Sequence, residues 1–148
     1  MIKNERQYGI TKAQVRNFAS AVSVAETRED VQPALRDLEL RALQSQLEEL
    51  QGELAEYDQL KSGAQAVLVV ERFDELPVAL IKARIAAHMT QKDLAERLGI
   101  KAQQIQQYEA TEYASASLTR IQEVIDALGV IVRNEVVLPS GTDVARRS

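Results

Sequence analysis

The stretch TQKDLAERLGIKAQQIQQYE, residues 90–109, decides the fold of the central part of the chain. Two short amphipathic runs flank one glycine, Gly99, and five residues of the stretch are glutamine. Thr90 stands where the side chain of a helix cap is expected. The apolar side chains that a helical period turns inward are Leu94, Ala95, Leu98, Ile100, Ile105 and Tyr108. The pattern predicts two short helices joined by a tight turn at Gly99.

The turn and its neighbours restrict how the two helices can cross. Gly99 falls where the chain must reverse sharply, which often requires a positive φ. Ala95 is small at the point where a larger side chain would make two steeply crossing helices collide. These constraints are typical of a helix-turn-helix, in which the second helix is held away from the body so that it can enter a DNA major groove.

The glutamines give the second helix an uncharged outer surface. A carboxamide offers a donor and an acceptor in one plane, which match the N6 and N7 atoms of adenine. Glutamine is also a good helix former on a solvated face, where it would read nothing. Its placement directly after the turn favours base recognition over this alternative. The residues left on the outer or flanking faces of the helix are Lys101, Gln103, Gln104 and Gln107.

Further helical patterns flank this pair of helices. The run ELPVALIKARIAAHM follows Asp74, a candidate cap, and has Pro77 in its opening turn. A last helix is expected from Ser117 to Gly129. The positions expected to face inward are Leu76, Leu80, Ile81, Ile85 and Ala86 in the first pattern and Leu118, Ile121, Val124, Ile125 and Leu128 in the second. Each helix is too short to be stable alone, so we expect four or five of them to enclose a common core.

Residues 76–130 resemble the Cro/cI-type (XRE-like) helix-turn-helix family of phage repressors and bacterial regulators, because TQKDLAERLGI is close to the usual second helix and turn of that family. The resemblance implies a five-helix lambda-repressor-like domain that binds double-stranded DNA. It also implies that Gln91 touches a backbone phosphate and that Arg84 and Glu109 form a structural pair. The base-reading positions that it implies are Lys101, Ala102, Gln103, Gln104 and Gln107.

The chain departs from the family pattern after Glu109. A glycine and then basic residues are common there, whereas this chain reads ATEYASAS, with the acidic Glu112 and no lysine or arginine before Arg120. We therefore expect low affinity for DNA or a strong dependence on dimerisation. Phosphate contacts are expected from backbone amides and from Thr90, Gln91, Lys92, Tyr113, Ser115 and Ser117, with Lys101 as a further cation.

Two longer helices are predicted in the N-terminal part, which lies outside the resemblance. The first covers residues 11–27 with Thr11 as a possible cap, and the second runs from Pro33 to about Lys61, before Gly63. The second carries a stripe with the alternating spacing of a coiled-coil seam, formed by Leu40, Leu43, Leu47, Leu50, Leu54 and Tyr57. The stripe needs a partner. Either the first helix covers it in a hairpin, or a second chain pairs with it in a homodimer, and both contacts can coexist.

Two β-branched segments, residues 66–70 and 130–139, are the only strand-like runs, and we expect them to pair. The predicted fold class is therefore mainly α: a helical hairpin or coiled-coil extension, then the five-helix domain with a small two-strand pairing beside it. The predicted division is a dimerisation or interaction region at 1–62, the DNA-binding domain with flanking strands at 63–138, and a disordered tail at 139–148.

Charge and composition limit the other functions that the chain could have. Residues 1–75 hold nine Lys/Arg against fourteen Asp/Glu, whereas residues 76–148 hold nine against eight, so a DNA-binding surface is expected in the second half. The chain has no cysteine, no apolar run of membrane-spanning length and no motif for a cofactor or a metal. The single histidine, His88, and the acidic pairs at 48–49 and 74–75 are more simply structural than catalytic.

The sequence thus predicts a cytoplasmic, homodimeric DNA-binding transcription regulator, a repressor rather than an enzyme, that acts on a pseudo-palindromic operator. One alternative is an antitoxin that autorepresses its operon while its acidic N-terminal helices occupy a basic toxin. Another is a protein-interaction adaptor that kept the fold and does not bind DNA, which the missing basic loop favours.

Overall fold

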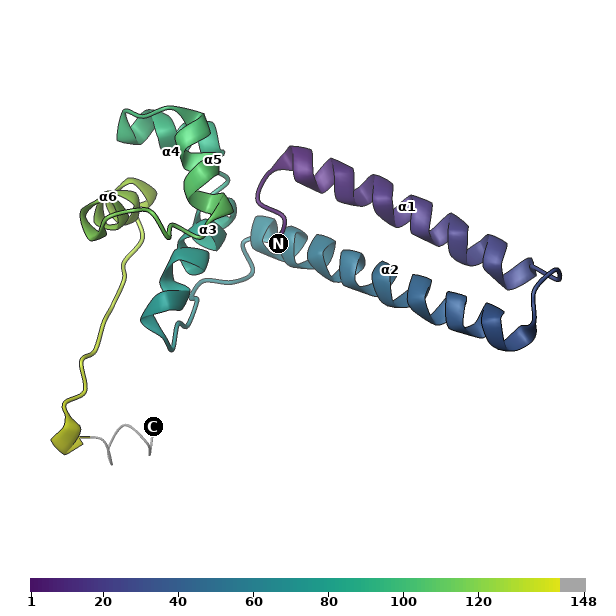
Figure 1. Cartoon of the computed structure of the whole chain (residues 1–148). Helices are drawn as coiled ribbons and strands as arrows, with labels where there is room; N and C mark the ends of the chain where they lie inside the picture. Colours follow the sequence, from purple (N-terminus) through teal and green to yellow (C-terminus); the bar gives the residue numbers. More distant parts are fainter. Residues whose placement is uncertain (142–148) are drawn as a thin grey trace.

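The computed structural model describes residues 1–141, and these form helices joined by turns and extended segments (Figure 1). The α-helices are α1 (Glu5–Thr27), α2 (Pro33–Ser62), α3 (Leu76–Ala86), α4 (Gln91–Leu98), α5 (Ala102–Ala110) and α6 (Leu118–Leu128). Short 3-10 turns are η1 (Phe73–Glu75) and η2 (Pro139–Gly141). Helices α1 and α2 form a long hairpin that projects from the cluster of α3–α6. Within residues 1–141, none of these helices combines the length and the hydrophobicity that crossing a membrane requires.

The hairpin begins earlier than its sequence pattern suggested. Helix α1 starts at Glu5 rather than after Thr11, because the side chain of Asn4 caps it by accepting from the backbone N–H of Gln7 at 2.8 Å. Gly9 interrupts the apolar pattern near this end and hides the first two turns from a search for periodicity. Helix α2 has the predicted bounds, and Gly63 ends it in the left-handed conformation with a φ of 72°.

The leucine stripe of α2 has a partner within the chain. Helix α1 lies along α2 over its whole length (Figure 1), and the stripe leucines from Leu40 to Leu54 are half-buried between the two helices. Tyr57, at the end of the stripe, is buried. The hairpin alternative therefore describes the contact in a single chain. Pairing with a second chain remains a prediction.

The four helices α3–α6 enclose a core, and four is the lower of the two numbers, four or five, expected from the pattern. The fifth α-helix that the resemblance implied does not occur within residues 76–130. The extra element is only the 3-10 turn η1, in which Asp74 pairs with Arg72 at 3.0 Å instead of capping α3. Leu118 was expected to face inward and is 69% exposed, because it is the first residue of α6, where the helix has not yet met its neighbours. The remaining inward positions of α3 and α6 are buried or half-buried.

The predicted strand pair is absent from residues 1–141, where no strand occurs. Residues 66–70 form an extended link between α2 and α3, in which Val67 and Val69 are exposed. Residues 130–138 run away from the helices (Figure 1) and leave Ile131 and Val136 exposed. β-branched residues favour a pleated surface only when a neighbouring strand supplies hydrogen bonds, and neither segment meets one. Of the predicted disordered tail, 139–141 form η2 and 142–148 lie outside the described residues.

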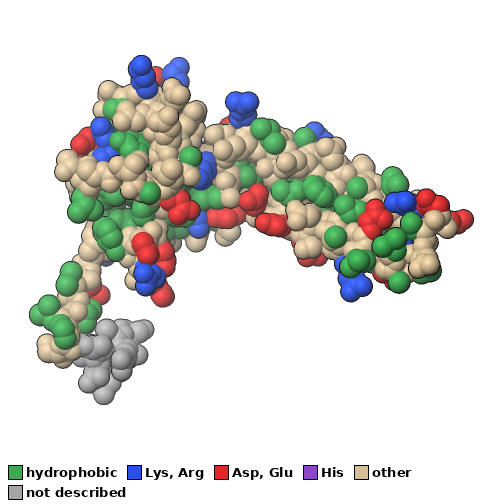
Figure 2. All heavy atoms as spheres, in the orientation of Figure 1, with side chains coloured by type: hydrophobic (Ala, Val, Ile, Leu, Met, Phe, Trp, Pro, Cys, Tyr) green, Lys and Arg blue, Asp and Glu red, His purple; other side chains and the backbone are tan. Residues whose placement is uncertain are grey.

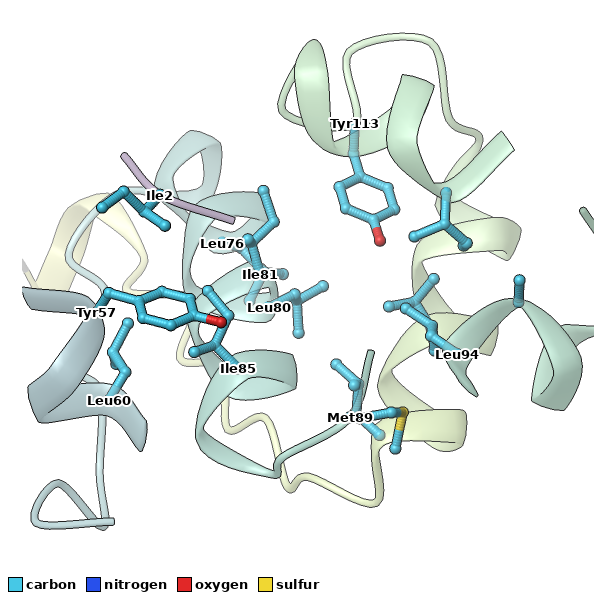
Figure 3. Close-up of a cluster of buried hydrophobic side chains, with 14 residues drawn as sticks. Ile2, Tyr57, Leu60, Leu76, Leu80, Ile81, Ile85, Met89, Leu94 and Tyr113 are labelled. Atoms are coloured by element: carbon cyan, nitrogen blue, oxygen red, sulfur yellow. The ribbon is translucent and has the colours of Figure 1, made fainter. Parts of the chain in front are cut away.

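One hydrophobic core connects the hairpin with the helix cluster. Ile2, Tyr57 and Leu60 from the base of the hairpin face α3 (Figure 3), and they belong to the same cluster of buried side chains as Leu80 and Ile85. An ion pair between Lys82 Nζ and Glu56 Oε1, at 3.3 Å, adds a polar contact between α3 and α2. The hairpin is therefore fixed in direction relative to the cluster.

Candidate nucleic-acid interface

Helix α4, which leads into the turn before α5, is capped at both of its ends. Thr90 and Asp93 form a reciprocal capping box: Thr90 Oγ1 accepts from the Asp93 N–H at 3.0 Å, and Asp93 Oδ2 accepts from the Thr90 N–H at 2.9 Å. The bond from the Thr90 backbone holds the pKa of the Asp93 carboxyl below its usual value. At the other end Gly99 has a φ of 68°, and a Cβ there would meet no atom within 4 Å. Glycine is needed at this turn for its conformation and not for space.

Helix α5 turns its glutamines outward. Ile105 and Glu109 are fully buried on its inner face, which leaves the glutamines of the helix exposed on the other faces. Within the described residues, the carboxamides of Gln103 and Gln107 make no hydrogen bond, and that of Gln104 donates to Tyr108 Oη at 3.2 Å. The exposed amides are Gln103, Gln104, Gln106 and Gln107. Among the expected base-reading residues, Ala102 is half-buried, and the others are exposed. Lys101 lies at the N-cap of α5.

A buried ion pair holds α5 from beneath. Glu109 is 0% exposed and Arg84 is 2% exposed. Arg84 Nε donates to Glu109 Oε2 at 2.6 Å and Nη2 donates to Oε1 at 2.8 Å, which is the bidentate geometry of a guanidinium and a carboxylate. Arg84 also donates to the backbone carbonyls of Met89 and Lys3. The pair expected from the sequence therefore connects α3, α5 and the N-terminal segment.

Two of the expected phosphate contacts lie in the interior instead. Gln91 is buried, and its side-chain amide donates to Glu109 Oε1 at 2.9 Å and accepts from Asn4 Nδ2 at 3.2 Å. Tyr113 is buried against Tyr108, with stacked rings 5.4 Å apart, and burial raises the pKa of its phenol. Both side chains are therefore part of the support of the helix-turn-helix and do not face outward.

The other expected phosphate contacts are accessible. Thr90 and Lys92 are exposed at the start of α4, and Ser115 is exposed in the turn after α5. Ser117 caps α6, since its Oγ accepts from the backbone N–H of Arg120 at 3.0 Å. This turn contains two residues with positive φ, Glu112 at 52° and Tyr113 at 59°.

Three polar residues near the interface were missed from the sequence. Gln106 lies three residues after Gln103, so the helical period already indicated that it belongs to the exposed side of the helix. Lys3 and Asn4 could not be predicted, because their contacts with α5 and α4 join residues 106 and 87 positions apart in the sequence. Lys3 Nζ donates to the carbonyl of Glu109 at 2.7 Å, so the N-terminal segment is hydrogen-bonded to the end of α5.

The comparison with protein families places this geometry in a known group. Residues 80–130, about a third of the chain, match the family model described as helix-turn-helix. No curated protein and no solved structure matched the chain. The family is one of DNA-binding regulators rather than of enzymes. The matched residues contain the capped α4, the turn at Gly99 and the glutamine-bearing α5, so this segment of the chain is similar to the XRE-like helix-turn-helix of such regulators.

Proposed function

We propose that the protein is a sequence-specific transcriptional repressor that binds double-stranded DNA as a homodimer on a pseudo-palindromic operator. The observation that carries the proposal is the row of exposed carboxamides on α5 above the buried Arg84–Glu109 pair. The buried pair fixes the backbone of α5, so little backbone freedom is lost when the helix meets DNA, although each glutamine side chain is still ordered on binding. Each bidentate amide contact contributes roughly 1–3 kcal/mol of discrimination against a wrong base.

The dimer is proposed to form through the hairpins lying side by side. Helix α2 has 30 residues and is about 45 Å long at 1.5 Å per residue. Contact between the hairpin tips alone would separate the two recognition helices by about twice that length, whereas adjacent major grooves on one face of DNA are about 34 Å apart. Two parallel hairpins in a four-helix arrangement bring the recognition helices closer together. Exposed apolar side chains near the tip support such a contact, namely Val24, Leu35 and Leu38.

Selection from random duplexes with the purified full-length protein tests this function. We expect one enriched sequence with two inverted half-sites, and protection of both half-sites in footprinting. The variant Gln103→Ala should fold normally and lose preference at one base position in each half-site. Enrichment of no sequence by the wild-type protein would contradict the proposal.

A role as an antitoxin is the second candidate, and the charge of α2 favours it. This helix carries seven Asp/Glu against three Lys/Arg, and Asp37, Glu48 and Glu49 are exposed. A basic protein partner would complement this surface. Copurification of a basic protein that is released at high salt, and whose expression alone arrests growth, would support the antitoxin role. A chain that purifies alone from its native cells at low salt would argue against it.

A further inference from the structure

A groove that several charged and polar side chains line lies between the base of the hairpin and the start of α4, next to α5. Its volume is about 310 Å³, and Arg6 of α1, Lys92 of α4 and Gln106 of α5 are among the residues that line it. The groove thus reaches α5 at Ala102 and Gln106, and it is bordered by an element outside the matched residues 80–130.

The cations of this groove fall into two groups. Lys61 is paired with Glu5 at 3.2 Å, and Arg84 is neutralised by Glu109. Arg6 and Lys92 are exposed and have no ion pair within the described residues. The groove therefore presents two positive charges that have no ion pair, one from α1 and one from α4, beside the helix that is proposed to enter the major groove of DNA.

The two helices of the hairpin differ in net charge, and only α1 lacks the net negative charge that would repel the phosphates of DNA. Helix α1 has three Lys/Arg against two Asp/Glu, whereas α2 is strongly acidic. In Figure 2, Lys and Arg side chains project from the edge formed by α4, α5 and α1, and Asp and Glu side chains gather over α2 near the helix cluster. The acidic helix lies on the side away from that basic edge.

The first turn of α1 is held firmly beside α4. Asn4, the cap of α1, donates to Gln91, the first residue of α4, at 3.2 Å. The Lys3 carbonyl accepts from Arg84 Nη2, and Lys3 Nζ donates to the last turn of α5. Arg6 is only two residues beyond this anchored cap. Its backbone is therefore ordered before any ligand arrives, which lowers the entropic cost of binding.

We infer that this groove holds the phosphate backbone of the same operator half-site that α5 reads, with one phosphate between Arg6 and Lys92. The inference rests on the proposed DNA-binding function. It assigns to the N-terminal hairpin the cationic contact that the turn after α5 lacks, since that turn carries Glu112 and no lysine or arginine. Phosphate contacts fix the register of a protein on DNA without reading sequence.

The test compares Arg6→Gln with Arg16→Gln in the full-length protein. Arg16 is an exposed residue of the same helix, about 15 Å farther along its axis, and it does not line the groove. Binding is measured by fluorescence anisotropy on the selected operator and on a scrambled duplex, over a series of salt concentrations. Circular dichroism of each variant checks that the fold is intact.

We expect Arg6→Gln to weaken binding to both duplexes by the same factor and to reduce the slope of log affinity against log salt by about 0.9. The ratio of the wild-type affinity to the variant's affinity should then fall about threefold between roughly 50 and 200 mM salt. Arg16→Gln should leave both affinities and the slope unchanged. This combination of results supports the inference.

Other results overturn the inference in distinguishable ways. If Arg6→Gln behaves like Arg16→Gln while Gln103→Ala still alters base preference, the groove does not bind phosphate and the proposed function stands. A change in base preference with Arg6→Gln also excludes a phosphate contact. If the wild-type protein binds neither duplex, the proposed function fails and the inference fails with it.

Discussion

Removing the Arg84–Glu109 pair should reveal how strongly it supports the recognition helix. We consider Glu109→Met and Arg84→Met, which replace each partner by an apolar side chain of similar length. The Glu109 carboxylate accepts three hydrogen bonds, two from Arg84 and one from Gln91, and the Arg84 guanidinium donates four in all. Both residues are almost completely excluded from solvent. Either single substitution therefore leaves one charge buried without its partner.

The cost of an uncompensated buried charge is about 3–5 kcal/mol. We expect each single variant to lose an amount of that order from the free energy of unfolding, which is a large part of the roughly 5–15 kcal/mol typical of a domain. The double variant removes both charges, so its loss should be smaller than the sum of the single losses by about 2–3 kcal/mol.

Urea unfolding followed by far-ultraviolet circular dichroism measures these free energies, with an unchanged denaturant slope as the check that the unfolding transition is the same. Because Arg84 also donates to the Lys3 carbonyl, hydrogen exchange in the first turns of α1 should speed up in Arg84→Met. Single losses below about 1 kcal/mol, or losses that simply add in the double variant, would show that the pair does not hold α5 as described.

Further substitutions test the turn, the dimer and the cap. Gly99→Ala should destabilise the protein by roughly 1–2 kcal/mol because alanine is strained at a φ of 68°, whereas Gly52→Ala within α2 should stabilise it by about 0.5–1 kcal/mol; thermal and urea unfolding of both decide this. Leu38→Asp should shift sedimentation from dimer to monomer without unfolding, and Val69→Asp, at an even more exposed position in the link, should not. The pKa of Asp93 is lowered in the folded protein, so its stabilising effect is present above its unfolded value of 3.8 and is lost as the pH falls through the lowered value. The melting temperatures of wild type and Asp93→Ala should therefore differ at neutral pH and converge in acid.

The features that the sequence predicted depend on neighbours along the chain. Helix spacing, the cap at Thr90 and the glycines at 63 and 99 are local signals, and they located α2 to α6 and the outward face of α5. The prediction of a strand pair was wrong because pairing depends on whether the segment after α2 and the segment after α6, which are distant in the sequence, meet in space. Gln91 has an ordinary helix-start position in the sequence, and only the approach of Asn4 and Glu109 explains its burial.

The continuous core at the base of the hairpin has a mechanical consequence. Because Ile2, Tyr57 and Leu60 are packed into the same core as α3, the hairpin acts as a rigid lever on the recognition helix. If the hairpin and the helix cluster rotate together by about 10° about this junction, the far end of a helix about 45 Å long moves by about 8 Å. A force on the tip would therefore turn the glutamine row of α5 together with the hairpin.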